Sequence, residues 1–92
     1  MTTSVRLTVT HPSGIHARPA SSFVQTAGQF SSEIQILNCA IAKGPVNAKS
    51  ILSVLTLGVA SGGEIELTAN GEDEIAAIQA IKNLVNSNFG EA

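Results

Sequence analysis

The residues best suited to chemistry lie in one short segment, Gly14-Ile15-His16-Ala17-Arg18-Pro19-Ala20. Pro19 has a fixed φ and no N–H, which suits the first turn of a helix, so a helix is predicted to begin at His16. There the backbone N–H groups of Ala17 and Arg18, the helix dipole and the Arg18 guanidinium would converge on an anion carried by the imidazole. A phosphoryl group fits that description. A histidine that only caps the helix or lies on the surface is the competing interpretation.

Composition narrows the class of protein. Ninety-two residues suffice for one domain, residues 1–92, without repeats or linkers. Five basic residues against seven acidic ones, with three phenylalanines as the aromatic residues, argue against nucleic-acid binding. Neither a signal-like start nor an apolar run of transmembrane length is present, so we expect a cytoplasmic protein without membrane insertion.

Metal and cofactor sites are not expected. The single cysteine, Cys39, excludes an intramolecular disulfide and a thiolate zinc cluster. His11 and His16 are five positions apart, and no carboxylate lies close in sequence to complete a metal site. The chain also lacks Walker, dinucleotide-binding and nucleophile-elbow patterns. We therefore expect no cofactor and no metal.

Hydrophobic periodicity predicts seven elements that would position the motif. The expected strands and helices, in chain order, are residues 5–10 (strand), 16–27 (helix), 33–36 (strand), 40–42 (short strand), 48–57 (helix), 64–69 (strand) and 72–85 (helix). Asn47 is the expected N-cap of the second helix, and Gly58 its stop. The last helix shows an apolar stripe of Ile75, Ile78, Ile81, Leu84 and Val85. This order predicts an α+β fold of two layers, a four-stranded mainly antiparallel sheet with three helices on one face.

The second expected helix carries more apolar surface than one core face needs. Its apolar residues spread over an arc of roughly 220°. They are Ile51, Leu52, Val54, Leu55 and Leu57. Either this short helix is sunk deep in the core, or part of the arc faces water and docks a partner.

Ser50 follows the expected cap by three residues and would lie in the first turn of the second helix. A phosphate on Ser50 would meet free N–H groups and a favourable dipole there, and Lys49 beside it adds positive charge. A serine in this position can equally be a local hydrogen-bonding residue.

Two separated motifs carry a resemblance to a known family. The segment 14–20, together with Val46-Asn47-Ala48-Lys49-Ser50-Ile51-Leu52 and Leu57-Gly58, resembles HPr, the histidine phosphocarrier family of the bacterial sugar phosphotransferase system. The likeness covers nearly the whole chain. It implies the two-layer fold and a phosphoryl carrier in place of an enzyme: enzyme I, charged by phosphoenolpyruvate, would donate to Nδ1 of His16, and sugar-specific IIA domains would receive. Ala17 would offer its N–H and Arg18 would neutralise charge in transit.

The resemblance also implies partners and regulation. Partner enzymes would contact a surface to which Ser21, Lys49, Ile51, Leu52 and Leu55 contribute, whereas Val54 and Leu57 would face inward. Ser50 matches a serine that an HPr kinase/phosphorylase modifies in many Gram-positive bacteria, where a transcriptional regulator can be a further partner. A monomer is expected.

Two alternatives and one departure remain. A nitrogen-branch phosphocarrier, or a regulatory module that acts by binding enzymes or transcription factors, would share the fold; the presence of His16 argues against a purely non-phosphorylated regulator. His16 and Ser50 are about three positions further apart than in common HPr sequences, with the extra residues in 37–43. We therefore expect a longer hairpin between the second and third strands.

Overall fold

The computed structural model describes residues 2–90. Its elements, in chain order, are β1 (Thr2–Thr8), α1 (Ala17–Ala27), β2 (Glu33–Asn38), β3 (Lys43–Asn47), α2 (Ile51–Thr56), β4 (Glu64–Asn70), α3 (Glu74–Asn86) and a short 3₁₀ turn, η1 (Asn88–Gly90). No helix within residues 2–90 is long and apolar enough to cross a bilayer.

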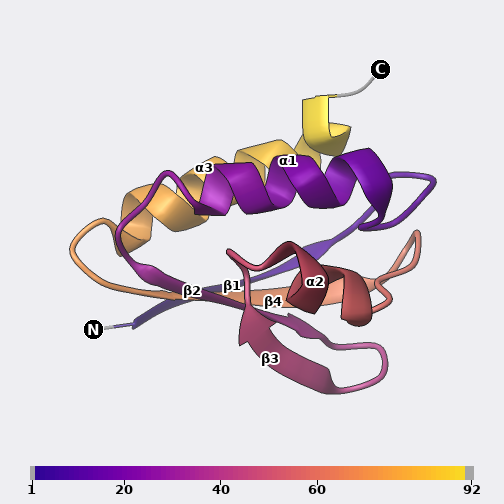
Figure 1. Ribbon diagram of the computed structural model, residues 1–92, viewed down its shortest axis with the longest axis horizontal. Helices are drawn as coiled ribbons and strands as arrows, with labels where there is room; N and C mark the ends of the chain where they lie inside the picture. Colours follow the sequence, from indigo (N-terminus) through magenta and orange to yellow (C-terminus); the bar gives the residue numbers. More distant parts are fainter. Residues whose placement is uncertain (1, 91–92) are drawn as a thin grey trace.

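The four strands form one antiparallel sheet in the order β1-β4-β2-β3. β4 lies centrally and pairs with β1 from Thr2↔Asn70 to Thr8↔Glu64. The three helices cover one face of this sheet, with α1 and α3 running side by side along it (Figure 1). The predicted α+β two-layer fold is confirmed.

The core fills the space between the sheet and the helices. Strand residues alternate between this core and the outer face, as the period-two pattern predicted. The largest fully buried side chains include Phe23, Ile34, Ile36, Val54, Leu57, Ile65, Leu67, Ile81 and Val85. Because aromatic residues are scarce, branched aliphatic side chains do most of the packing.

The prediction of a third strand at residues 40–42 is wrong. Residues 39–42 form a turn, and the strand follows it as β3, which includes Gly44 and Pro45. Proline cannot donate to the ladder, so it is disfavoured inside a sheet. β3 lies at the edge of the sheet, where a missing N–H is tolerated. The predicted hairpin in 37–43 therefore closes through a four-residue turn.

The start of the second helix was also placed too early. Asn47 is the last residue of β3, where it pairs with Gln35, and its Oδ1 accepts the Lys49 N–H at 2.9 Å. The N-cap is Ser50, whose Oγ accepts the Ser53 N–H at 3.4 Å. Because β3 extends to Asn47 and a turn follows it, residues 48–50 are not helical and α2 begins at Ile51.

One residue of the predicted α3 stripe faces water. Ile75 is 74% exposed, and Glu74 takes the inward position instead. The Glu74 carboxylate accepts the Thr3 hydroxyl at 2.5 Å and the Gly71 N–H at 3.3 Å. These bonds to the ionised form, the Thr3 bond first, lower the pKa of Glu74. The rest of the stripe packs on the core as predicted.

Candidate functional site

His16 is the N-cap of α1, and its side chain is not used to cap the helix. Its backbone is extended (φ −132°, ψ 161°), its side chain makes no capping hydrogen bond, and the residue is exposed. The competing interpretation was a histidine that caps the helix or simply lies on the surface, and the structure contradicts the capping role only. The imidazole is therefore available to a partner molecule.

The residue after His16 has an unusual backbone. Ala17 has φ +50°, a left-handed conformation that costs energy for any residue with a Cβ. Within residues 2–90, the N–H groups of Ala17 and Arg18 donate to no backbone or side-chain acceptor. Two unsatisfied donors thus lie at the start of α1, directly after His16 in the chain, where the macrodipole of α1 also favours negative charge.

The segment before His16 is held by the chain that follows α2. Ile15 is fully buried, and its N–H donates to the Val59 carbonyl oxygen at 3.0 Å. Gly14 has φ +65°, and a Cβ built there would lie 2.1 Å from the same oxygen. Both the positive φ and the lack of space for a Cβ therefore require glycine at position 14. The sequence motif contained Gly14 and Ile15 but gave no signal for their partner, Val59.

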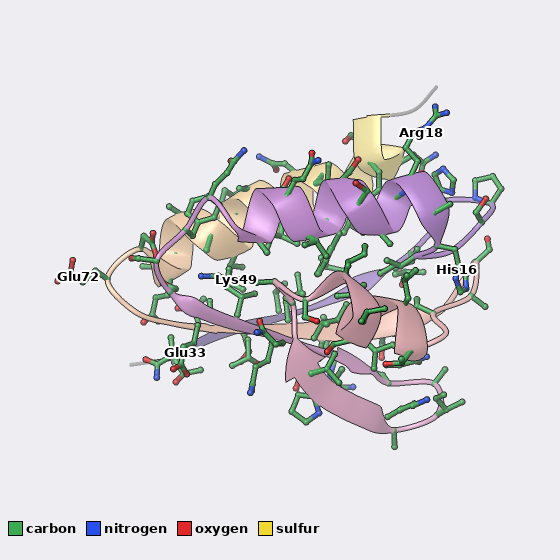
Figure 2. All side chains as sticks on the ribbon, viewed as in Figure 1. His16, Arg18, Glu33, Lys49 and Glu72 are labelled. Carbon is green, nitrogen blue, oxygen red and sulfur yellow. The ribbon has the colours of Figure 1, made fainter. Side chains whose placement is uncertain are left out.

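Arg18 does not reach the ring in this structure. The helix carries the residue to the neighbourhood of His16, but its side chain points away from the sheet, toward the C-terminal end of the chain, whereas His16 lies nearer α2 (Figure 2). Arg18 is exposed. The structure therefore brings together the His16 ring and the start of α1, but not the guanidinium that was expected to join them.

Three residues of α2 form a surface that we call the α2 patch: Ile51, Leu52 and Leu55. Ile51 is 39% exposed and Leu52 73% exposed, whereas Leu55 is half-buried and packs against the core. Val54 and Leu57 on the opposite face are fully buried. The helix is therefore not sunk in the core, and its outer side is apolar as the surplus arc suggested.

The remaining expected contact residues are spread over the molecule. Ser21 is exposed on α1, in the turn after Ala17. Lys49 is half-buried, and its Nζ donates to the Phe30 carbonyl oxygen at 2.6 Å, at the far end of α1 from His16 (Figure 2). The Lys49 ammonium is thus engaged within the fold, and not held next to the imidazole.

A shallow cleft lies at that far end. It has a volume of about 300 Å³ and is lined by Ser31, Ser32, Glu33, Ile34, Gln35, Asn47 and Lys49. Asp73, the N-cap of α3, accepts hydrogen bonds there from the N–H and hydroxyl groups of Ser31 and Ser32. These bonds, the Ser32 hydroxyl first, lower the pKa of Asp73 to about 2. His16 is not among the residues that line this cleft.

Metal ligation has no support in the described part of the chain. No group of three or more His, Cys, Asp or Glu residues within 2–90 could hold an ion. His11 is buried, accepts the Ser13 N–H on Nδ1 at 3.0 Å and meets the Phe89 ring edge-on with centroids 5.9 Å apart. It is part of the packing around the turn before His16.

Comparisons with known proteins agree with this geometry. Residues 3–87 match the family described as "PTS HPr component phosphorylation site". The phosphocarrier protein HPr of Treponema pallidum is 42% identical over 83 residues, which cover 90% of this chain and 91% of that protein. The solved HPr structure from Thermoanaerobacter tengcongensis is 43% identical with a TM-score of 0.91 and 98% of each chain covered. A dimeric HPr structure from the same organism is 49% identical with a TM-score of 0.75, covering 85% of this chain and 86% of that one. This chain, whose His16 stands at the start of α1 without a capping hydrogen bond from its side chain, belongs to the HPr family, the phosphocarriers of the phosphotransferase system.

Proposed function

We propose that this protein accepts a phosphoryl group on His16 from phosphorylated enzyme I and passes it to sugar-specific IIA domains. The observation that carries the proposal is the exposed His16, whose side chain has no capping role and which directly precedes the unpaired N–H groups at the start of α1. Membership of the HPr family points to phosphoryl transfer as the chemistry, and the exposure of His16 supports this residue as the phosphoryl acceptor.

The transfer step needs a neutral imidazole. The lone pair of His16 Nδ1 forms the new P–N bond while the bond from phosphorus to the donor breaks and its electron pair returns to the donor. The proton of the neutral ring stays on Nε2. Passing the group to a IIA domain reverses this sequence with a new acceptor, so the chain itself is left unchanged after each cycle.

The surroundings suit a carrier because they stabilise the phosphoryl group only moderately. The Ala17 N–H and the dipole of α1 favour the added charge, while exposure to water screens it. A buried, multiply bonded phosphate would be held too tightly to leave. Arg18 can assist in transit once its side chain turns toward the ring, because its stem is exposed and unconstrained by packing.

The α2 patch is the proposed docking surface for both partners. The exposed apolar surface of Ile51 and Leu52 is hydrated in the free protein and loses that water when a partner covers it. The same surface must serve donor and acceptors in turn, so the carrier is proposed to act as a monomer.

Regulation at Ser50 is a further part of the proposal. An HPr kinase/phosphorylase would modify the hydroxyl that now caps α2, and a transcriptional regulator could then bind the modified form. The added dianion would lie at the edge of the α2 patch, because Ser50 precedes Ile51 directly.

The decisive experiment is phosphorylation in a purified system. Incubation with enzyme I and phosphoenolpyruvate should add one phosphoryl group that is labile in acid and stable in alkali, as a phosphoramidate is. The His16→Ala protein should acquire none. His11→Ala, at the chain's other histidine, should still be labelled, and its cooperative thermal unfolding is checked first because His11 is buried in the packing before His16. A His16→Ala protein that is labelled equally would overturn the proposal.

A further inference from the structure

The short C-terminal turn η1 has a strained backbone. Asn88 and Phe89 have φ +55° and φ +59°, in the left-handed region that residues with a Cβ adopt at a cost in energy. The cost is larger for a bulky residue such as Phe89 than for an asparagine, yet the Phe89 side chain is buried. A backbone of this kind persists only where surrounding contacts hold it, so the contacts of η1 must offset the cost.

Two side-chain contacts join η1 to the segment that leads to His16. Thr10 Oγ1 donates to Asn88 Oδ1 at 2.7 Å, although the two residues are 78 positions apart. The rings of His11 and Phe89 meet edge to face, with centroids 5.9 Å apart and an interplanar angle of 79°. Figure 1 shows η1 beside α1, toward the end of the molecule where the loop before α1 lies. The C-terminal turn therefore holds residues 10 and 11 in place.

His11 also shapes the turn that leads to His16. Its Nδ1 accepts the Ser13 N–H at 3.0 Å, and its carbonyl oxygen accepts the Gly14 N–H at 2.9 Å. The first bond has the form of an Asx turn, in which a side-chain acceptor binds the N–H two residues further along the chain. One buried histidine thus connects η1 to the turn of residues 11–14, and His16 follows this turn by two residues.

The ends of the same loop are held by backbone bonds instead. Val9 exchanges two hydrogen bonds with residues 62–63, at 2.8 and 2.7 Å, and the Ile15 N–H donates to the Val59 carbonyl oxygen at 3.0 Å. Between these two anchors, residues 10–14 are held from the C-terminal turn through side chains. Loss of that contact would leave the middle of the loop free to shift, and the imidazole that follows it would shift too.

We propose that His11, held by the ring of Phe89, is a positioning residue for phosphoryl transfer to His16. The inference rests on the proposed carrier function, and neither His11 nor Phe89 makes or breaks a bond in it. Transfer between two proteins needs the accepting nitrogen at near-attack geometry, and a displacement of about 1 Å can slow such a step strongly. Holding the loop from the far end of the chain fixes that nitrogen without adding a group that would bind the phosphate too tightly.

The test separates the transfer step from docking. Transfer from phosphorylated enzyme I is followed by rapid quenching at increasing carrier concentration, which gives a limiting rate and a half-saturating concentration. Phe89→Leu keeps an apolar side chain and removes the ring contact, and His11→Asn removes the same contact but keeps an acceptor for the Ser13 N–H. Each variant should lower the limiting rate about fivefold at an unchanged half-saturating concentration, because the α2 patch is untouched. Labelling at completion should still reach one phosphoryl group.

A double variant shows whether the two residues act through one contact. His11→Asn combined with Phe89→Leu should be no slower than the slower single variant, because either change alone already removes the ring contact. Ile34→Val is the matched control, since Ile34 is buried in β2 and lines the cleft near Glu33 and Lys49, away from His16 (Figure 2). Its limiting rate should equal that of the unmodified protein.

Thr10→Val tests the second tie between the loop and η1. It removes the bond to Asn88 at the surface and keeps the volume of the side chain, so the fold should be intact. We expect its limiting rate to fall about twofold, again at an unchanged half-saturating concentration. If Phe89→Leu does not unfold cooperatively, His11→Asn and Thr10→Val decide the question, because both leave Phe89 in the core.

The outcomes separate this inference from the carrier function. If the unmodified protein is not phosphorylated on His16, the carrier function itself fails. If it is phosphorylated and the folded variants transfer at the rate of Ile34→Val, only the positioning role is refuted. A raised half-saturating concentration with an unchanged limiting rate would also refute it, because the contact would then serve docking. Losses that multiply in the double variant would show that the ring contact is not the link.

Discussion

The N–H of Ile15 donates to the carbonyl oxygen of Val59 at 3.0 Å, and this bond joins the residue before His16 to the segment that follows α2. The two residues are distant in sequence and both fully buried. The proposed phosphorylation site, His16, and the proposed docking helix, α2, are thus parts of one packed unit. Under the proposed function, a partner on α2 would meet His16 at a fixed position, which is what rapid transfer between proteins needs.

Gly14→Ala should break this connection. The new Cβ would lie 2.1 Å from the Val59 oxygen in a backbone with φ +65°, so the loop must move. We expect a loss of stability of about 2–4 kcal/mol and slower phosphorylation of His16. Gly58→Ala is the control: its φ is +62°, but nothing lies within 4 Å of the new Cβ, so only the backbone cost of about 1 kcal/mol should appear. Equal destabilisation of the two variants in urea unfolding would contradict the close-contact explanation.

Leu52→Glu should separate docking from folding. Leu52 is 73% exposed, so a charge there should leave the melting temperature nearly unchanged while weakening association with enzyme I. Val54→Glu, two residues along the same helix, buries an unpaired charge at a fully buried position and should unfold the protein. Calorimetry and titration with enzyme I measure the two effects. Similar melting temperatures for both variants would show that α2 has no distinct outer face.

Substitutions of Ser50 should divide its two roles. Ser50→Ala removes the Oγ that accepts the Ser53 N–H, and should cost about 1 kcal/mol of stability without adding charge. Ser50→Asp keeps an acceptor at the N-cap and adds a negative charge beside the α2 patch, so stability should be kept.

The affinity for enzyme I should rank the two Ser50 variants in the opposite order to their stability: Ser50→Ala, the less stable variant, should bind better than Ser50→Asp. The charge of Ser50→Asp is present in free and docked protein, but only docking brings it against a partner, so the apparent affinity for enzyme I should fall in this variant and not in Ser50→Ala. Rates measured against enzyme I concentration test this. An unchanged affinity for Ser50→Asp would leave Ser50 as a structural cap and no switch.

Acid should destabilise the fold through Asp73. Its carboxylate accepts bonds from Ser31 and Ser32, which lower its pKa to about 2 in the folded state. A group whose folded pKa lies below its unfolded value stabilises the protein when ionised, so this contribution is full above about pH 4 and is lost as pH falls toward 2. Urea midpoints between pH 2 and pH 6 measure it. Asp73→Asn should be less stable at pH 6, and its urea midpoint should fall less as the pH drops from 6 to 2. An equally steep fall would assign the effect to other carboxylates, with Glu74 the first to examine.

Local sequence signals were sufficient where a short stretch of chain decides the structure. Pro19 suits the first turn of a helix whatever surrounds it, and the helix does begin directly after His16. Alternation in β4 followed from periodicity alone, because burial of one face is the main driving force for a strand of this kind. The inward position of Val54 and Leu57, which the family resemblance implied, is confirmed.

Tertiary structure decided everything that depends on residues far apart in sequence. Pro45 lies in a strand because β3 is at the edge of the sheet, which no local signal reveals. The pairing of Asn47 with Gln35 moved the cap of α2 to Ser50. The carboxylate of Glu74 accepts a hydrogen bond from Thr3 on β1, so Glu74 is buried while Ile75 is exposed. Val59 became the anchor of the His16 loop because a buried N–H must find an acceptor, and only the folded chain determines which carbonyl is close enough to provide it.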